Sequence, residues 1–95
     1  MTKNETISHW KKMIANDYAW AVRALVRIYE NQTADEQEIG ATVHHNSVGF
    51  NGVDAELLTS FAQQVKQGRS LSPRQRQFLH KKMPKYAGQL YDLVN

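Results

Sequence analysis

The chain has 95 residues, of which 41% are hydrophobic and 22% charged, and its net charge is +3. This size and composition predict one folded domain with a thin core and exclude a wholly disordered chain. Without cysteine there are no disulfides or thiolate metal sites, and no run approaches the roughly 18 apolar residues that a membrane span needs. We therefore expect a cytoplasmic protein that has no signal peptide and no contact with a membrane.

The charges are unevenly distributed along the chain. Residues 1–56 contain five Lys and Arg against eight Asp and Glu, whereas residues 57–95 contain seven basic residues and one acidic residue, Asp92. No carboxylate occurs between Leu57 and Tyr91. Such asymmetry favours a polyanionic partner for the C-terminal half, although the acidic N-terminal half can also balance these charges in space.

The N-terminal segment predicts a long helix over residues 5–29, capped by Thr2 or Asn4. Its apolar residues follow one another in steps that mostly place them on one helix face. They are Ile7, Trp10, Ile14, Tyr18, Ala21, Leu25 and Ile28.

Two features interrupt this pattern. Asn16 and Asp17 compete for backbone hydrogen bonds and are expected to bend or split the helix. Trp20 and Val22 lie off the apolar stripe, so Trp10 and Trp20 are expected to mark different faces. A second apolar face suits a helix packed on two sides, or a homodimer through residues 5–29.

Turns and a loop are expected in the middle of the chain. Residues 31–35 read as a turn, followed by a short helix that Thr33 caps and Gly40 ends. Residues 44–54 contain two glycines and two asparagines and predict a structured loop, with Gly49 and Gly52 at positive φ. Its expected apolar anchors are Val48, Phe50 and Val53.

Two further helices are predicted in the basic half. Asp54 is expected to cap a helix over residues 55–67, which Gly68 ends. Ser72, Pro73 and Gln75 form an S-x-x-Q capping box with proline at the first helical position. The last helix follows, with an apolar stripe of Leu79, Met83, Tyr86, Leu90 and Leu93.

Pro84 lies inside the last helix, where it removes a backbone hydrogen bond. Because the apolar spacing continues through it, a kink near residues 81–83 is preferred over a break into helices 73–82 and 84–94.

The fold class is thus predicted to be all-α. We expect a small single-domain helical bundle over residues 1–95, with a Gly/Asn-rich loop and a Pro-kinked C-terminal helix. Residues 1–40 would form an N-terminal helical arm, and residues 41–95 the loop plus a two-helix basic module.

The candidate nucleic-acid-binding residues are basic side chains of the C-terminal half together with two loop residues. They are Lys66, Arg69, Arg74, Arg76, Lys81, Lys82 and Lys85, with His45 and Asn51. Arg74, Lys81 and Lys85 share one helix face opposite the apolar stripe, and helix rise spreads them over roughly 16 Å. We call these three residues the cationic rail, which could follow several phosphates. Aromatic residues are too sparsely interleaved to indicate stacking on single strands.

No catalytic or metal-binding pattern is present. Asp54 and Glu56 are explained by their place at a helix N-terminus, and no nucleophile accompanies them. His44 and His45 are adjacent, so on an extended segment they face opposite ways and do not share an ion. We therefore expect a non-enzymatic protein without metal or cofactor.

Three segments resemble a short module of phage- and plasmid-borne proteins. They are Asn46–Asp54 with its Gly-Phe-Asn loop, Leu71–Gln75 with an L-S-x-x-Q helix start, and Lys85–Leu90 with a K-Y-x-x-Q-L end. The likeness covers about residues 46–90. The similar segments are ones appended to helicase-type DNA-processing chains. The likeness implies an origin in a mobile element and traffic with DNA, and no established activity comes with it.

The sequence therefore favours a small accessory protein that binds nucleic acid, with DNA preferred. The alternative is a protein-binding modulator or inhibitor that docks on a DNA-processing or host defence complex. In that case the same basic face would meet acidic protein, or the Trp10 and Trp20 surfaces would meet apolar protein. A third hypothesis is a homodimer built on the first helix.

Overall fold

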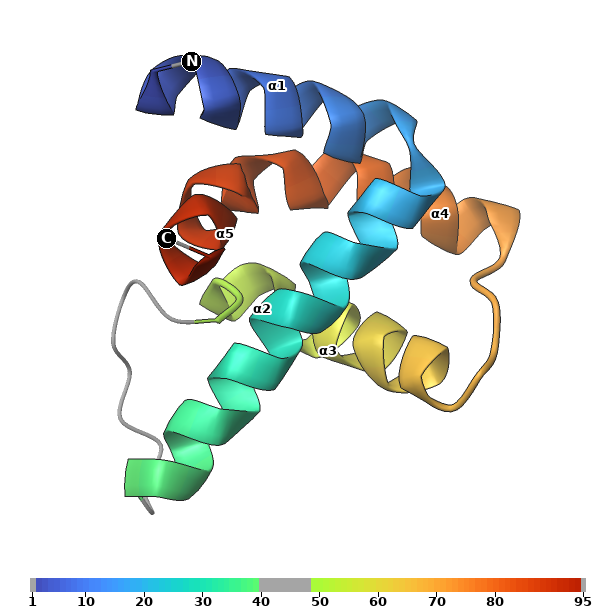
Figure 1. Cartoon of the computed structure of the whole chain (residues 1–95). Helices are drawn as coiled ribbons and strands as arrows, with labels where there is room; N and C mark the ends of the chain where they lie inside the picture. Colours follow the sequence, from blue (N-terminus) through green and yellow to red (C-terminus); the bar gives the residue numbers. More distant parts are fainter. Residues whose placement is uncertain (1, 40–48, 95) are drawn as a thin grey trace.

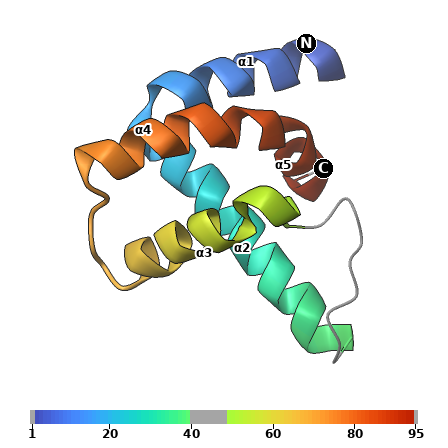
Figure 2. The same cartoon turned by 180° about the vertical axis from the view of Figure 1, so that it is seen from behind.

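The computed structural model of the chain describes residues 2–39 and 49–94, and for residues 33–39 only the backbone. Every element in these ranges is a helix, which confirms the predicted all-α class. The elements are α1 (Lys3–Asn16), α2 (Tyr18–Ile39), α3 (Gly52–Lys66), α4 (Pro73–Lys82), the 3₁₀ helix η1 (Met83–Tyr86) and α5 (Ala87–Val94). In Figure 1, α1 runs alongside the α4–η1 segment, while α2 crosses in front of α3 and α4. Figure 2, seen from behind, places α3 and α4 in front of α2.

The predicted first helix is split at Asp17. This residue has an extended backbone (φ −116°, ψ 118°), and its N–H still donates to the Met13 carbonyl at the end of α1. Its carboxylate Oδ1 accepts from the backbone N–H of Ala19 at 2.9 Å and thereby caps α2. One residue therefore ends one helix and begins the next, so the chain changes direction sharply without a connecting loop of several residues.

The outer ends of α1 and α2 differ in how well they were predicted. Thr2, rather than Asn4, caps α1, in a reciprocal capping box with Glu5. The predicted turn over residues 31–35 is wrong, because α2 continues through it to Ile39. The predicted stop at Gly40 lies outside the described residues.

The start of α3 lies three residues earlier than predicted. Asn51 is the N-cap residue and Gly52 the first helical residue, so Asp54 is the third residue of the helix and not its cap. Gly49 has the predicted positive φ, +87°, whereas Gly52 does not. Val53 is 93% exposed, so it is not an apolar anchor, whereas Phe50 is buried as predicted.

The connection between α3 and α4 follows the predicted signals closely. Gly68 has φ +82° and donates to the Val65 carbonyl, while the Arg69 N–H donates to the Gln64 carbonyl. These two bonds make the Schellman motif that ends α3. The Ser72–Gln75 capping box then opens α4, as predicted.

Pro84 is accommodated in a 3₁₀ turn and not by a simple kink. The helix α4 ends at Lys82, η1 covers residues 83–86, and α5 begins at Ala87. Met83 keeps right-handed helical dihedrals (φ −71°, ψ −31°), so the chain stays helical through the proline. The tighter 3₁₀ pitch turns α5 away from the line of α4 (Figure 1).

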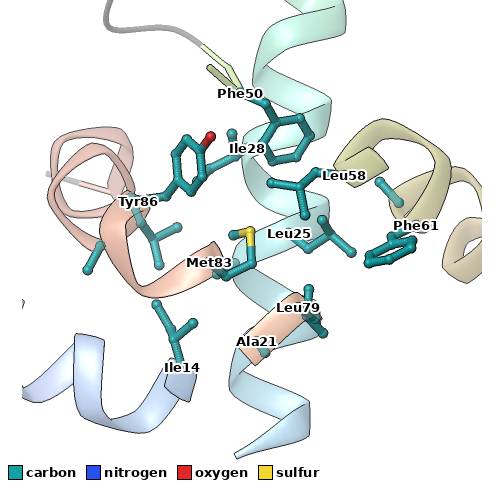
Figure 3. Packing of buried hydrophobic residues seen from close by; sticks show 14 of the residues in the cluster. Ile14, Ala21, Leu25, Ile28, Phe50, Leu58, Phe61, Leu79, Met83 and Tyr86 are labelled. Atoms are coloured by element: carbon teal, nitrogen blue, oxygen red, sulfur yellow. The ribbon is translucent and has the colours of Figure 1, made fainter. Parts of the chain in front are cut away.

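The core is assembled from every helix. Figure 3 shows side chains of α1, α2, α3 and η1 converging, with Met83 near Leu25 and Tyr86. Ile14, Leu25, Ile28, Leu58, Leu79 and Met83 are fully buried. The predicted apolar stripe of the last helix is confirmed, since Leu79, Met83, Tyr86 and Leu90 all lie in this cluster. Residues of α1 and α2 share it, so the N-terminal helices are part of the same core.

We expect Gly49→Ala to destabilise the domain. Gly49 holds a positive φ, and a Cβ there would lie 2.8 Å from Cγ of Gln32, so strain and a clash add. A loss of about 1–3 kcal/mol in the free energy of unfolding, measured by urea denaturation, is expected. Gly52→Ala is the matched control, because its Cβ would meet nothing within 4 Å. Equal midpoints for the two variants would show that Gly49 is not constrained.

Candidate nucleic-acid interface

The basic half of the chain encloses one buried carboxylate. The side chain of Asp54 is 1% exposed and accepts a hydrogen bond from the Tyr86 hydroxyl at 3.0 Å. Lys82 Nζ lies 3.2 Å from its Oδ1, and Lys85 Nζ forms an ion pair with its Oδ2. We call these four residues the Asp54 network. A buried carboxylate needs such compensation, because removal from water without partners would be prohibitive.

The network shifts the pKa of two groups in opposite directions. Burial alone would raise the pKa of Asp54, but hydrogen bonds from Lys85, Lys82 and Tyr86, with the Lys85 charge, lower it below its ordinary value near 3.8. Burial, together with the neighbouring Asp54 carboxylate, raises the pKa of Tyr86 to about 12. Asp54 therefore stays ionised at neutral pH and Tyr86 stays protonated as a hydrogen-bond donor.

The same corner of the molecule holds the described end of the loop. The backbone N–H of Asn51 donates to the Tyr86 hydroxyl at 2.9 Å, and that of Phe50 donates to Gln32 Oε1 at 2.9 Å. Gln89 is bonded to Gly49 twice, accepting from its N–H at 2.8 Å and donating to its carbonyl at 3.0 Å. Side chains of α2, η1 and α5 thus replace the backbone partners that an extended strand would have.

These contacts correct the predicted cationic rail. Lys85 is placed by the sequence on the helix face opposite the apolar stripe, yet it pairs with the buried Asp54. Lys82, a further candidate for binding nucleic acid, pairs with Asp54 as well. Sequence reasoning misses this because Asp54 also fits a helix N-terminus, where a carboxylate needs no other explanation. Only tertiary packing brings the carboxylate to within reach of lysines 28 and 31 positions later.

Two further predicted site residues also have intramolecular contacts. Lys66 forms an exposed ion pair with Glu30 at 3.2 Å. The Arg76 guanidinium lies over the Tyr18 ring, 4.0 Å from its centroid, and its Nε donates to the Leu71 carbonyl at 3.2 Å. Arg76 therefore fastens the α4 start to α2, a position that holds its charge at the surface but limits its reach.

The remaining predicted basic residues are exposed and unpaired. Arg69 precedes α4, while Arg74 and Lys81 lie seven positions apart on it and so share one helix face. None of the three has an ion-pair or hydrogen-bond partner for its side chain among the described residues. We call Arg69, Arg74 and Lys81 the free cations.

The start of α4 offers little room for an anion on its backbone. Pro73 has no N–H, and the Gln75 N–H is taken by Ser72 Oγ at 3.2 Å. The Arg76 N–H donates to the Ser72 carbonyl, so only the Arg74 N–H is left over in this turn. A phosphate held between Arg69 and Arg74 would therefore depend on their side chains.

The two predicted loop residues are not placed together with the free cations. His45 lies outside the described residues, so its contribution stays a prediction. Asn51 is described and its side chain is exposed, but it makes no capping hydrogen bond. It lies beside the Asp54 network, whereas Arg74 lies at the other end of the α4–η1 segment.

A second surface is an apolar groove of about 500 Å³ between α2 and α5. Trp10 and Trp20 line it, with ring centroids 6.3 Å apart, so their predicted placement on different faces is wrong. The split at Asp17 resets the helical register and brings the two indoles together. Val22, Ala24, Val26, Leu90 and Val94 complete the apolar lining, and Arg23, Arg27 and Glu30 supply its charges.

Other chemistries find no support in the described ranges. No three His, Asp or Glu side chains gather there as metal ligands, and none of the helices there has the length and apolarity to cross a membrane. Comparison with protein-family models, characterised proteins and solved structures finds no match to this chain.

We expect Asp54→Asn to lower the free energy of unfolding by about 1–3 kcal/mol at pH 7, because it removes a charged acceptor of three buried or half-buried donors. The loss stays below that of a fully buried pair, since the partly exposed lysines can turn to water. Glu56→Gln is the matched control, an exposed carboxylate two residues away, and should change stability by less than about 0.5 kcal/mol.

The lowered pKa of Asp54 predicts how the stability difference between the parent and Asp54→Asn changes with pH. Because folding lowers the pKa of Asp54, its stabilisation is present above the ordinary carboxyl pKa near 3.8 and is lost as the pH falls through the folded-state value. Chemical denaturation at a series of pH values should therefore show the parent and Asp54→Asn converging in acid. A constant difference from neutral to strongly acidic pH would contradict a role for the ionised carboxylate.

Proposed function

We propose that this protein is a small non-enzymatic accessory protein of the cytoplasm that binds nucleic acid, DNA above all. The observation that carries the proposal is the set of free cations, Arg69, Arg74 and Lys81. They are exposed and have no partner among the described residues, in a segment from Leu57 to Tyr91 without any carboxylate. Unpaired surface cations without nearby acids are the electrostatic footprint that phosphate backbones select.

The Asp54 network adds to this field and does not cancel it. Two lysines share one carboxylate, so Lys82 and Lys85 retain one net positive charge next to Lys81 on the α4–η1 segment. The acids that balance the chain overall lie mainly in residues 1–56. The resemblance of residues 46–90 to modules of DNA-processing chains from mobile elements supports the same proposal.

We expect Arg74→Gln with Lys81→Gln to weaken DNA binding without unfolding the protein. Glutamine keeps helix propensity at both exposed sites, so stability should change by less than about 0.5 kcal/mol per site. In a fluorescence-anisotropy titration across salt concentrations, the log–log slope for duplex DNA should become shallower by about 0.9 for each phosphate that the variant no longer neutralises.

The matched control is Lys11→Gln with Lys12→Gln, which removes the same charge from exposed positions of α1. This control should keep most of the salt slope, because those lysines lie outside the carboxylate-free segment that contains the free cations. Equal losses in both double variants would mean that only net charge matters. Absence of binding by the parent protein to any nucleic acid at low salt would overturn the proposed function.

A second candidate, self-association, is favoured by the apolar groove. When two copies of α2 are laid antiparallel, with the Val26–Arg27 peptide at the two-fold axis, Arg23 of one copy falls opposite Glu30 of the other. A two-fold interface must be self-complementary in this way. Trp10 and Trp20 would supply the aromatic surface that such contacts favour. This contact would lie largely within residues 5–29, the predicted dimer segment.

We expect light scattering over a wide concentration range to show a dimer that Arg23→Glu converts to a monomer. Combining Arg23→Glu with Glu30→Arg should restore the dimer, because the charges are exchanged and still complementary. Loss of the exposed Lys66–Glu30 pair costs little in this double variant. A parent protein that is monomeric at every concentration would leave the groove to a different protein, as in the modulator hypothesis.

A further inference from the structure

The outward face of α4 carries a stripe of four exposed residues. Arg74, Gln77, Phe78 and Lys81 follow the spacing i, i+3, i+4 and i+7, which places them on one side of the helix. The buried Leu79 lies on the other side. We call these four residues the α4 stripe. It contains two cations, a neutral amide and an aromatic ring, but no carboxylate.

Phe78 is the unusual member of the stripe. Of the nine Phe, Trp and Tyr residues in the chain, it is the most exposed, at 38%. Phe50 and Phe61 are buried, and the Trp10 ring lies against those of Trp20 and Tyr91. Phe78 has no ring or cation contact with any described residue. Phe78 thus leaves part of an aromatic ring in water between two unpaired cations, an arrangement that offers stacking surface and positive charge to the same ligand.

We propose that the α4 stripe is a binding site for single-stranded nucleic acid, in which Phe78 stacks on a base while Arg74 and Lys81 contact flanking phosphates. This inference rests on the proposed function and narrows it to one class of ligand. The faces of bases are covered in a duplex, so an aromatic side chain on a convex helix gains nothing there. In a single strand every base offers a free face, and the stacking is tolerant of sequence.

The dimensions of the stripe agree with this ligand. Helix rise separates Arg74 from Lys81 by roughly 10 Å along the α4 axis, with Phe78 between them. A stacked strand advances about 3.4 Å per nucleotide, so the stripe spans about three nucleotides. Gln77, one position from Phe78, has an amide that can donate and accept, which suits the edge of an unpaired base.

The test compares binding of oligo(dT) with binding of a DNA duplex of the same length, for the parent and variants at position 78. Phe78→Ala should weaken oligo(dT) binding by about 5- to 150-fold, the change that corresponds to loss of one base–aromatic stack. Duplex binding should change by less than about twofold, within the range of surface substitutions. Phe78→Trp should retain oligo(dT) binding, since it keeps a flat aromatic surface.

Salt dependence separates stacking from charge. Phe78→Ala should leave the salt slope for oligo(dT) unchanged, whereas Lys81→Gln should reduce it by about 0.7, the value for one phosphate contact on a single strand. Phe78→Leu, with an apolar side chain of similar size, keeps the comparison valid if alanine destabilises the fold. It should lose oligo(dT) affinity as alanine does, because leucine has no flat face.

The outcomes distinguish this inference from the function on which it rests. If the parent binds both ligands and Phe78→Ala weakens them equally or not at all, the stacking site is wrong while nucleic-acid binding stands. Binding to neither ligand at low salt overturns both. Full oligo(dT) binding by Phe78→Leu would also overturn the inference, because apolar contact would then suffice without an aromatic ring.

Discussion

The packing of α3 against the α4–η1 segment depends on a buried carboxylate, that of Asp54. Asp54 stands at the third position of α3, almost wholly removed from water, and it is compensated by two lysines and a tyrosine from the α4–η1 segment. An uncompensated charge in such a place would be more costly than most side-chain contacts are favourable. The beginning of α3 and the 3₁₀ turn that contains Pro84 are therefore fixed against each other, and the Tyr86 hydroxyl extends the constraint to the backbone of Asn51.

Contacts next to this network also give structural roles to residues of two of the three sequence motifs. The glycine–phenylalanine–asparagine segment and the K-Y-x-x-Q-L segment are far apart in the chain but meet in space. Gln89 holds both polar backbone groups of Gly49, and the Phe50 ring packs edge-on against Tyr86 at 5.7 Å. Leu90 completes the core. A structural role accounts for these residues, so the proposed binding of nucleic acid depends mainly on the surface outside the network.

The surface with unpaired basic side chains is smaller than the charge pattern of the sequence suggests, because most of the predicted basic residues have partners within the protein. Lys82 and Lys85 are held by Asp54, Lys66 by Glu30, and Arg76 by Tyr18 and a backbone carbonyl. Arg69 and the outward face of α4 remain, and on that face Arg74 and Lys81 flank the exposed Phe78 ring. The split at Asp17 produces a second distinct surface, because the change in helix direction gathers two indoles beside α5.

Local interactions could be predicted from the sequence by itself. The all-α class, the capping box at Ser72, the glycine stop at Gly68 and the buried stripe of the last helix all depend on residues within one or two helical turns. Thr2 is one of two caps predicted for the first helix, and the structure selects it. Asn16 and Asp17 stand out in the sequence as the weak point of the first helix, but bending and splitting cannot be told apart there. Only tertiary structure decided which lysines are free, where Asp54 points and how Trp10 and Trp20 meet. The physical reason is that each of these features depends on groups that packing brings together from distant positions in the chain. Over such sequence separations, the spacing of residues does not determine how their side chains are oriented relative to one another.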